Sequence, residues 1–420
     1  MTTPATTPAT RPGAPDLPAG YDLTDPSILE VGLPFEELAE LRATAPAFWV
    51  EQTPEAYAGF ENSPGYWAVT RHADVAAVSR SKEFSTNENG AIIRFAPDMT
   101  REQVEVQSVM LINQDPPQHT RYRQIISRGF TPRAIAALKE DLDTRARRII
   151  SEAKERGSGN FVEDIASELP LQAIADLLGV PQKDRRKLLD WSNQMLAYDD
   201  PDYNADPELA AAELLGYFMA MADDRRRNPQ DDLVTKLITA DVDGQALSDD
   251  EFGYFTIILT VAGNETTRNA ITHGMNAFFE NPDQWELYKK ERPDTACDEI
   301  IRYATPVTVF QRTALSDVQL GDQLVEKGKR VGLFYASANF DNEVFDEPHR
   351  FDITRQPNPH LAFGGHGAHY CIGANLARME VSLVFDAIAD LMPDISKAGE
   401  PNRLRHAWIN GVKELQVTYR

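Results

Sequence analysis

Two segments of this 420-residue chain carry apolar residues at helical spacing. In the first, Ser248-Asp249-Asp250-Glu251 has the spacing of a capping box, and the apolar pattern continues to Phe279 before Asn281-Pro282. This pattern predicts one helix of about thirty residues. At about 1.5 Å per residue it would span some 45 Å, which is long enough to cross the middle of a globular domain.

The second periodic segment follows a glycine-rich loop. The loop is Phe363-Gly364-Gly365-His366-Gly367-Ala368-His369-Tyr370-Cys371-Ile372-Gly373. The helix after it is predicted from apolar residues at helical spacing before Met392-Pro393, namely Leu376, Met379, Leu383, Ala387, Ile388 and Leu391. Unpaired N–H groups and the helix dipole favour an anion at this helix start, so we expect Cys371 to ionise readily. The glycines would let the backbone approach a large flat ligand.

Cys371 has several possible roles. A free cysteine is commonly a small buried hydrophobic residue. A zinc module would have to recruit His366 and His369, because zinc normally needs four ligands, whereas one thiolate suffices as the axial ligand of haem iron. A dinucleotide-binding loop is excluded, because Tyr370 occupies the last glycine position of the pattern that begins at Gly365.

The middle of the long helix breaks the local rules. Val261-Ala262-Gly263-Asn264-Glu265-Thr266-Thr267 puts glycine, an acid and two β-branched residues where helix propensity disfavours them. The Thr266 hydroxyl could donate to the Ala262 carbonyl, and Gly263 would leave room beside it. This arrangement predicts a groove with a proton donor and space for water or a small gas molecule. The alternative is a helix kink with a solvated Glu265.

Composition and length bound the class of protein. Residues 1–20 repeat Thr, Pro and Ala without an apolar period and predict a flexible arm, which leaves 21–420 as a single domain. No apolar run of about 18 residues and no signal-peptide pattern occurs, so we expect a cytoplasmic protein without a membrane anchor. Two cysteines, Cys297 and Cys371, cannot form a disulfide framework.

The net charge of -23 argues against nucleic acid as a partner. The sign reverses between His119 and Arg148, where eight basic residues face three acids. The basic residues are Arg121, Arg123, Arg128, Arg133, Lys139, Arg145, Arg147 and Arg148. Such a run is a solvated helix face or a docking patch for an acidic protein.

Three weaker motifs complete the pattern. Glu299-x-x-Arg302 lies one helical turn apart before Thr305-Pro306 and suits an ion pair, which Arg350 could join. After Asp115-Pro116-Pro117, His119 and Arg123 lie four residues apart on one helix face. Two cationic groups there could hold two carboxylates of a ligand.

In this order and at these separations, the residues resemble the cytochrome P-450 superfamily along almost the whole chain. The resemblance rests on 363–373, Ala262-Gly263-x-Glu265-Thr266, Glu299-x-x-Arg302, Pro348-x-Arg350-Phe351 and His119-x-x-x-Arg123. It implies a mainly α fold with a smaller β region, and haem b buried between the long central helix and the helix after the cysteine loop. One departure is that Phe363 lies eight rather than seven residues before Cys371, which we interpret as a one-residue bulge.

The resemblance also implies roles for individual residues. Cys371 would be the axial ligand of the haem iron, and Glu265 and Thr266 would deliver protons during dioxygen activation. Glu299, Arg302 and Arg350 would form a structural network. The haem would also be bound by Gly373 and by the residues expected to hold its propionates, namely His119, Arg123, Arg312 and His369.

A closer resemblance is to the actinobacterial steroid C26/C27-monooxygenases, through Leu111-Ile112-Asn113-Gln114-Asp115, the run 262–274, the run 282–288 and Gly373-Ala374-Asn375-Leu376-Ala377-Arg378. It implies hydroxylation of the terminal methyl of cholesterol or cholest-4-en-3-one, in some members on to aldehyde and acid. Apolar candidates for the substrate pocket are Ile93, Val261, Ala262, Val307 and Trp408.

We expect the electrons to come from another protein, because no flavin or nicotinamide domain fits in the 49 residues after Cys371. The resemblance implies a ferredoxin with its ferredoxin reductase, which would dock on the basic patch. Two alternatives remain for the function. One is an omega-hydroxylase of methyl-branched fatty acids or isoprenoids, and the other is a haem-binding sensor without turnover.

Overall fold

The computed structural model describes residues 17, 20–57, 64–96, 99–127, 129–203, 205–240 and 247–420. Apart from Leu17 and Gly20, the predicted arm 1–20 lies outside the described residues, as does Arg128. The fold is mainly α with a smaller β region, as predicted.

The helices are α1 (Pro26–Val31), α2 (Phe35–Thr44), α3 (His72–Arg80), α4 (Arg101–Val106), α5 (Gln118–Ser127), α6 (Pro132–Ala137), α7 (Lys139–Arg156), α8 (Glu168–Leu178), α9 (Arg185–Leu196), α10 (Pro207–Arg227), α11 (Leu233–Ile238), α12 (Asp249–Glu280), α13 (Pro282–Glu291), α14 (Ala296–Ala304), α15 (Tyr335–Ala338) and α16 (Ala374–Leu391). The strands are β1 (Ala47–Glu51), β2 (Gly65–Val69), β3 (Phe84–Ser85), β4 (Ser158–Asn160), β5 (Val309–Ala314), β6 (Val318–Leu320), β7 (Gln323–Val325), β8 (Arg330–Phe334), β9 (Ser396–Lys397), β10 (Asn402–Arg403), β11 (Val412–Glu414) and β12 (Gln416–Thr418).

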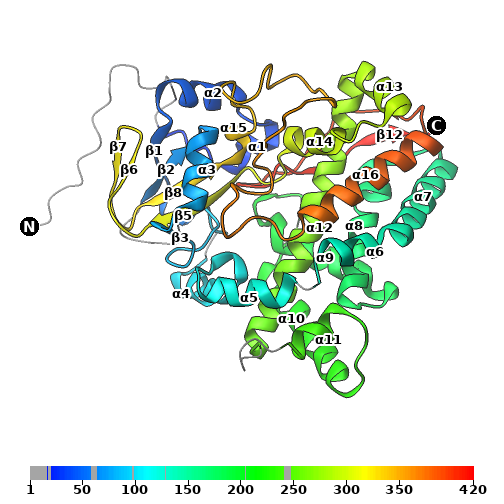
Figure 1. The fold of residues 1–420 in the computed structure, drawn as a ribbon, viewed down its shortest axis with the longest axis horizontal. Helices are drawn as coiled ribbons and strands as arrows, with labels where there is room; N and C mark the ends of the chain where they lie inside the picture. Colours follow the sequence, from blue (N-terminus) through cyan, green and yellow to red (C-terminus); the bar gives the residue numbers. More distant parts are fainter. Residues whose placement is uncertain are drawn as a thin grey trace, which may run out of the picture.

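The long predicted helix is α12, which runs for 32 residues. Its start is fixed by the predicted capping box, in which Ser248 and Glu251 satisfy each other's backbone N–H groups. It ends at Glu280, with Asn281 as the C-cap, and Pro282 opens α13. In Figure 1, α12 crosses the helical part of the molecule from the neighbourhood of α10 and α11 toward α13.

The five-stranded sheet has the order β1-β2-β8-β5-β3 and lies on the side of the molecule away from α7 and α16 (Figure 1). β2 and β8 are parallel, and the other pairs are antiparallel. β8 is buried at every position, as a central strand covered on both faces should be. The register places Arg312 of β5 opposite Val331 of β8. The position of this cationic side chain in the sheet is therefore fixed.

The largest apolar core surrounds α12 and includes buried residues of α8, α14 and α16. Close approach of these helices depends on Gly274, where a Cβ would lie 2.6 Å from Ile300 of α14 and 2.9 Å from the Phe385 ring of α16. The helix after the cysteine loop therefore packs directly on the long helix at Gly274. Among the described helices, none combines the length and apolar character needed to cross a bilayer.

Candidate active site

The cysteine loop folds back on itself before α16. The N–H of Cys371 donates to the carbonyl of Phe363 at 2.9 Å, so the two ends of the eight-residue interval meet. Gly364 at φ 95° and His366 at φ 62° lie in the left-handed region between them. These two left-handed residues let the loop close although the interval is one residue longer than in the family pattern, which agrees with the predicted bulge.

Two of the loop glycines are needed for packing on α3. A Cβ on Gly365 or Gly367 would overlap Ser79 of α3, at its side chain and its carbonyl oxygen respectively. These two glycines therefore let the loop pack on α3, a contact that the sequence did not indicate. Gly373 is different, because a Cβ there would lie 3.8 Å from the Cys371 sulfur.

The Cys371 side chain is exposed, although the surrounding protein is dense enough to raise the pKa of its thiol. Burial is the largest cause, and hydrogen bonds from the Gly373 and Ala374 backbone together with the charges of Arg123 and Arg378 oppose it. The backbone groups at the helix start thus lower the pKa of Cys371, as predicted. Burial outweighs them, so the net pKa is raised rather than lowered. A bound metal cation would favour the thiolate.

Thr266 makes the predicted hydrogen bond in the middle of α12. Its Oγ1 donates to the carbonyl oxygen of Ala262 at 2.7 Å. Ala262 is exposed while the neighbouring Asn264 and Glu265 are buried, so one face of the helix borders open space. The predicted room beside Gly263 is absent, because a Cβ there would lie 2.5 Å from Cδ1 of Ile174 on α8.

Glu265 is buried and ion-paired, which excludes the alternative of a solvated side chain. Its Oε1 accepts from Nη2 of Arg268 and from Nδ2 of Asn269, the latter at 2.8 Å. Arg268 also donates to Asn193 of α9 at 3.1 Å. Sequence reasoning missed Arg268, although its spacing three residues after Glu265 is a recognised signal for a helical ion pair.

Four basic side chains from three parts of the chain gather near Cys371. The rings of His119 on α5 and His369 in the cysteine loop have centroids 4.3 Å apart. Arg123 lies one turn after His119, and Arg312 on β5 contributes to lowering the pKa of both histidines. Burial, reinforced by the charge of Arg123, lowers the pKa of His119 to about 4. The sequence predicted this cluster.

These groups fit haem. Cys371 offers one exposed sulfur ligand for the iron, and the four basic side chains would hold the two propionates. Among the described residues, Nε2 of His119 is buried without a hydrogen-bond partner, and Asp115 is the acidic group that acts on both His119 and Arg312. Bound carboxylates would supply the missing acceptor and counter-charge.

The zinc alternative is wrong for the described part of the chain. It contains no group of three or more His, Cys, Asp or Glu side chains arranged to hold a metal ion. His366 stacks on Tyr370 instead, with ring centroids 5.4 Å apart. Within the described part of the chain, Cys371 therefore belongs to no group of three potential metal-binding side chains.

The apolar candidates converge from four distant segments. Ile93 and Trp408 are buried in one apolar cluster, and Val261 and Val307 pack against it. Val307 is also bridged to Ile409, next to Trp408. Ala262 lies outside this cluster, although it adjoins Val261. Sequence reasoning missed the contribution of Leu196 and Ala197, at the end of α9, because no pattern links that segment to the others.

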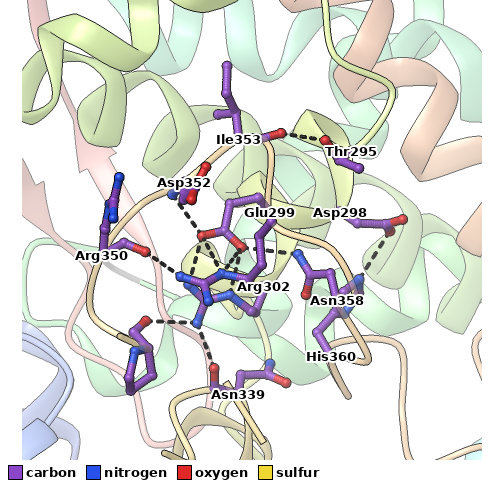
Figure 2. A network of polar contacts seen from close by, with 12 residues as sticks. Thr295, Asp298, Glu299, Arg302, Asn339, Arg350, Asp352, Ile353, Asn358 and His360 are labelled. Carbon is purple, nitrogen blue, oxygen red and sulfur yellow. Dashed lines mark hydrogen bonds and ion pairs between the residues drawn. The ribbon is translucent and has the colours of Figure 1, made fainter. Parts of the chain in front are cut away.

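Figure 2 shows the network around Glu299 and Arg302 of α14, both fully buried. Arg302 donates to the two Glu299 oxygens at 2.8 Å each. The third member of the network is Arg355, whose Nε lies 3.1 Å from Glu299 Oε2. The prediction of Arg350 was wrong, because its guanidinium pairs with exposed Glu347 at 3.0 Å. Arg350 contributes only its carbonyl oxygen, which accepts from Arg355 at 2.9 Å.

Four of the eight residues of the predicted basic run form ion pairs within the molecule. Arg121 pairs with Glu251, Arg145 with Asp141, Arg147 with Asp143 and Arg148 with Glu152. A cavity of about 870 Å³ lies beside the run, between α3, α5 and the cysteine loop. Its lining includes the exposed Arg80 and Lys82 together with Arg121, Arg312 and His369. Arg80 at the end of α3 and Lys82 just after it therefore add positive charge at the surface, which the sequence did not indicate.

Comparison with known proteins matches this geometry. Residues 294–388 match the family model described as Cytochrome P450. The chain is 59% identical to the steroid C26-monooxygenase of Rhodococcus jostii, over 97% of this chain and 86% of that protein. It is 41% identical to the methyl-branched lipid omega-hydroxylase of Mycobacterium tuberculosis, over 91% and 90%.

The fold is also similar to that of a solved protein. A cytochrome P450 of Mycobacterium marinum in complex with pseudoionone superposes with a TM-score of 0.88 at 35% identity, over 95% of this chain and 98% of that one. The arrangement of helices and strands is thus a known architecture. This chain belongs to the cytochrome P450 family.

Proposed function

We propose that this cytochrome P450, a monooxygenase with haem as its cofactor, hydroxylates the terminal methyl of a steroid side chain at C26 or C27. The reaction would consume one O₂, two electrons and two protons, and would yield the side-chain alcohol and one water. Cholesterol and cholest-4-en-3-one are the proposed substrates. Repetition at the same carbon would lead to the aldehyde and then the acid.

The observation that carries this proposal is the 59% identity, over 97% of the chain, to a protein named steroid C26-monooxygenase. The apolar cluster that contains Ile93 and Trp408 supports it, because a hydrocarbon ligand needs an apolar lining. Omega-hydroxylation of methyl-branched lipids is the second candidate, since a relative with that name is 41% identical.

Haem with a thiolate ligand supplies dioxygen activation when it is bound. Cys371 would provide the thiolate, and His119, Arg123, Arg312 and His369 would orient the cofactor through its propionates. Thr266 would hold a proton at Oγ1, beside the exposed Ala262. The Glu265 carboxylate is held by Arg268, so its exchange of protons with Thr266 would depend on that ion pair opening.

A spectroscopic titration tests the substrate. The purified protein would be titrated with cholest-4-en-3-one, a methyl-branched fatty acid and a terpenoid, while the haem spin state is followed, and products would then be identified. We expect the steroid to bind most tightly and to yield a product oxidised at the side-chain terminus. Tighter binding and turnover of the branched fatty acid would favour the second candidate.

Substitution of Thr266 tests the proton-delivery role. Thr266→Ala should retain haem and consume reducing equivalents, but should release them as peroxide or water rather than as hydroxylated product. The ratio of product to electrons consumed is the measurement. A variant that hydroxylates at the wild-type ratio would show that Thr266 does not act in proton delivery, and a non-catalytic haem sensor would give no product with either protein.

We also propose that a ferredoxin, reduced by its reductase, docks at the cavity edge formed by Arg80 and Lys82. Both side chains are exposed beside the cysteine loop, whereas Arg147 and Arg148 on α7 are paired with acids of the same helix. Electrostatic attraction to an acidic partner should speed association and weaken with salt.

Neutralising Arg80 and Lys82 together should slow electron transfer from the ferredoxin at low salt and flatten its salt dependence. Neutralising Arg147 and Arg148 serves as the control and should leave both unchanged. Equal effects of the two pairs, with haem retained, would contradict docking at the cavity edge. The outcome does not depend on which substrate the enzyme accepts.

A further inference from the structure

Phe363 lies beside the guanidinium of Arg378 on α16 and the imidazole of His360. The guanidinium carbon of Arg378 lies 4.6 Å from the centroid of the Phe363 ring, within range of a cation–π interaction. The His360 ring lies 5.7 Å from the same centroid. The residue whose spacing departs from the family pattern is therefore placed between two basic side chains.

One carboxylate holds both of these basic side chains. Oδ1 of Asp298 on α14 accepts from Nε of Arg378 at 2.7 Å and lies 3.1 Å from Nε2 of His360. Although burial acts to raise it, hydrogen bonds from His360 and Arg378 lower the pKa of Asp298 to about 2. Figure 2 shows Asp298 and His360 beside the Glu299 network, so the anchor adjoins the fully buried pair of Glu299 and Arg302 on α14.

Arg378 also reaches the residue next to the cysteine. It is hydrogen-bonded to Tyr370, whose ring lies 6.4 Å from that of Phe363. The carbonyl of Phe363 accepts from the N–H of Cys371 at 2.9 Å. Arg378 thus contacts Phe363 at one end of this interval and Tyr370, the residue before Cys371, at the other.

We propose that Arg378, fixed by Asp298, is a positioning residue that holds Phe363 and Tyr370, and through them Cys371, and so adjusts how strongly the thiolate donates to the haem iron. The inference rests on the proposed role of Cys371 as the iron ligand. A positive charge close to the sulfur stabilises the reduced, more negative state of the haem. Loss of that charge should therefore make reduction harder, and loss of the Asp298 charge should make it easier.

The simpler view is that Asp298 and Arg378 form an ordinary ion pair, since their side chains are 37% and 32% exposed. Pairs of this kind contribute little to stability. The two views differ in what they predict for the haem. If the ion pair is an ordinary one, removing the charge of Arg378 or that of Asp298 should leave the haem reduction potential unchanged. If its loss only loosens the cysteine loop, both substitutions should shift the potential in the same direction.

The test uses the haem-loaded protein and compares Arg378→Gln, Arg378→Lys and Asp298→Asn with wild type. The haem reduction potential is measured for each, together with the rate at which the red-shifted Soret band of the ferrous carbon monoxide complex is lost. Arg147→Gln is the control, because it also removes an arginine that pairs with an α16 acid, Asp390, but far along that helix.

We expect a lower potential for Arg378→Gln, a higher one for Asp298→Asn and no shift for Arg147→Gln. Arg378→Lys should keep the wild-type potential, because it retains the charge. It should nevertheless lose the red-shifted band roughly two- to fivefold faster, because a planar cation over the ring is worth about 0.5–1 kcal/mol. A variant that fails to bind haem leaves the other two to decide.

Shifts of the same sign for Arg378→Gln and Asp298→Asn, or no shift in either, would overturn the inference. The proposed role of Cys371 fails in a different way. In that case the wild-type protein itself would give no red-shifted band with carbon monoxide, whatever the variants do. The two failures can therefore be told apart in one series of measurements.

Discussion

Two buried carboxyl groups near the site have opposite surroundings. Glu265 on α12 has Arg268 and Asn269 as partners. Glu380 on α16 is 1% exposed, and Thr267 is the group that donates a hydrogen bond to it, while its Oε1 has no hydrogen-bond partner among the described residues. Without a neighbouring cation, burial raises the pKa of Glu380 to about 8, so this group is protonated in the fold at neutral pH.

Replacement of Glu380 should change how stability depends on pH. Between pH 4.5, the ordinary pKa of the group, and about 8, the folded protein keeps a proton that the unfolded chain has lost. The free energy of unfolding therefore falls as pH rises through this window. Glu380→Gln does not titrate, so its advantage over wild type should grow from pH 5 to pH 8 by a few kcal/mol, at about 1.4 kcal/mol per pKa unit.

Denaturant unfolding of the haem-loaded proteins at both pH values measures this difference. Glu155→Gln is the control, because Glu155 is an exposed acid on α7. It should track wild type at both pH values. If the Glu380→Gln curve ran parallel to wild type, the buried carboxyl would be ionised in the fold.

At the scale of helices, α12 combines a regular start with an irregular middle. The capping box at Ser248 and the stop at Asn281 follow local rules. Gly263 in the centre breaks these rules, because glycine has a low helix propensity. A glycine is needed there because Ile174 of α8 occupies the space that a side chain would take. Helix propensity and packing therefore make opposite demands at this position.

Gly263→Ala should destabilise the protein despite the higher helix propensity of alanine. The propensity gain is about 1 kcal/mol, whereas forcing a methyl group into a packed contact typically costs about 1–3 kcal/mol. Gly216→Ala on α10 is the matched control, because nothing lies within 4 Å of the added Cβ, and it should be stabilising. Thermal unfolding compares the two, and Ile174→Val should partly restore Gly263→Ala. Stabilisation by both alanines would mean that α8 yields without cost.

At the scale of the whole molecule, the Glu299 network joins α14 to the irregular segment that leads into the cysteine loop. The Glu299 carboxylate accepts hydrogen bonds from Arg302 of its own helix. From the irregular segment it accepts hydrogen bonds from the side chains of Arg355 and Asn358 and from the N–H of Asp352. Because these groups converge on one buried carboxylate, the segment before Cys371 is anchored to the core. The same helix carries Asp298, which holds Arg378.

Arg355→Gln should therefore lower stability, whereas Arg350→Gln should resemble wild type. Hydrogen bonds to a charged group are worth roughly 1.5–3 kcal/mol, and Arg355 donates to buried Glu299 with 9% of its side chain exposed. Arg350 is exposed and pairs with an exposed acid. Denaturant unfolding and haem retention after gel filtration measure both variants. A greater loss for Arg350→Gln would contradict the observed network.

Much of the site could be predicted from the sequence, but the contacts between residues far apart along the chain could not. The long helix, the Thr266 hydrogen bond, the basic cluster and the bulge at Phe363 all appear in the fold. Arg355 was missed because it lies in a segment without a period, and Arg378 because its partner Asp298 is 80 residues away along the chain. The role of Arg268 was within reach, since the interval from Glu265 is local.

By itself, the sequence determined what depends on intervals of three or four residues, such as the capping box at Ser248, the Thr266 to Ala262 bond and the pairing of Glu299 with Arg302. Helical geometry converts such spacing directly into contact. Only the tertiary structure decided which further arginine meets Glu299, that Ile174 fills the space at Gly263, and that burial outweighs the helix start at Cys371. Burial and distant neighbours set these outcomes, and neither is encoded in local spacing.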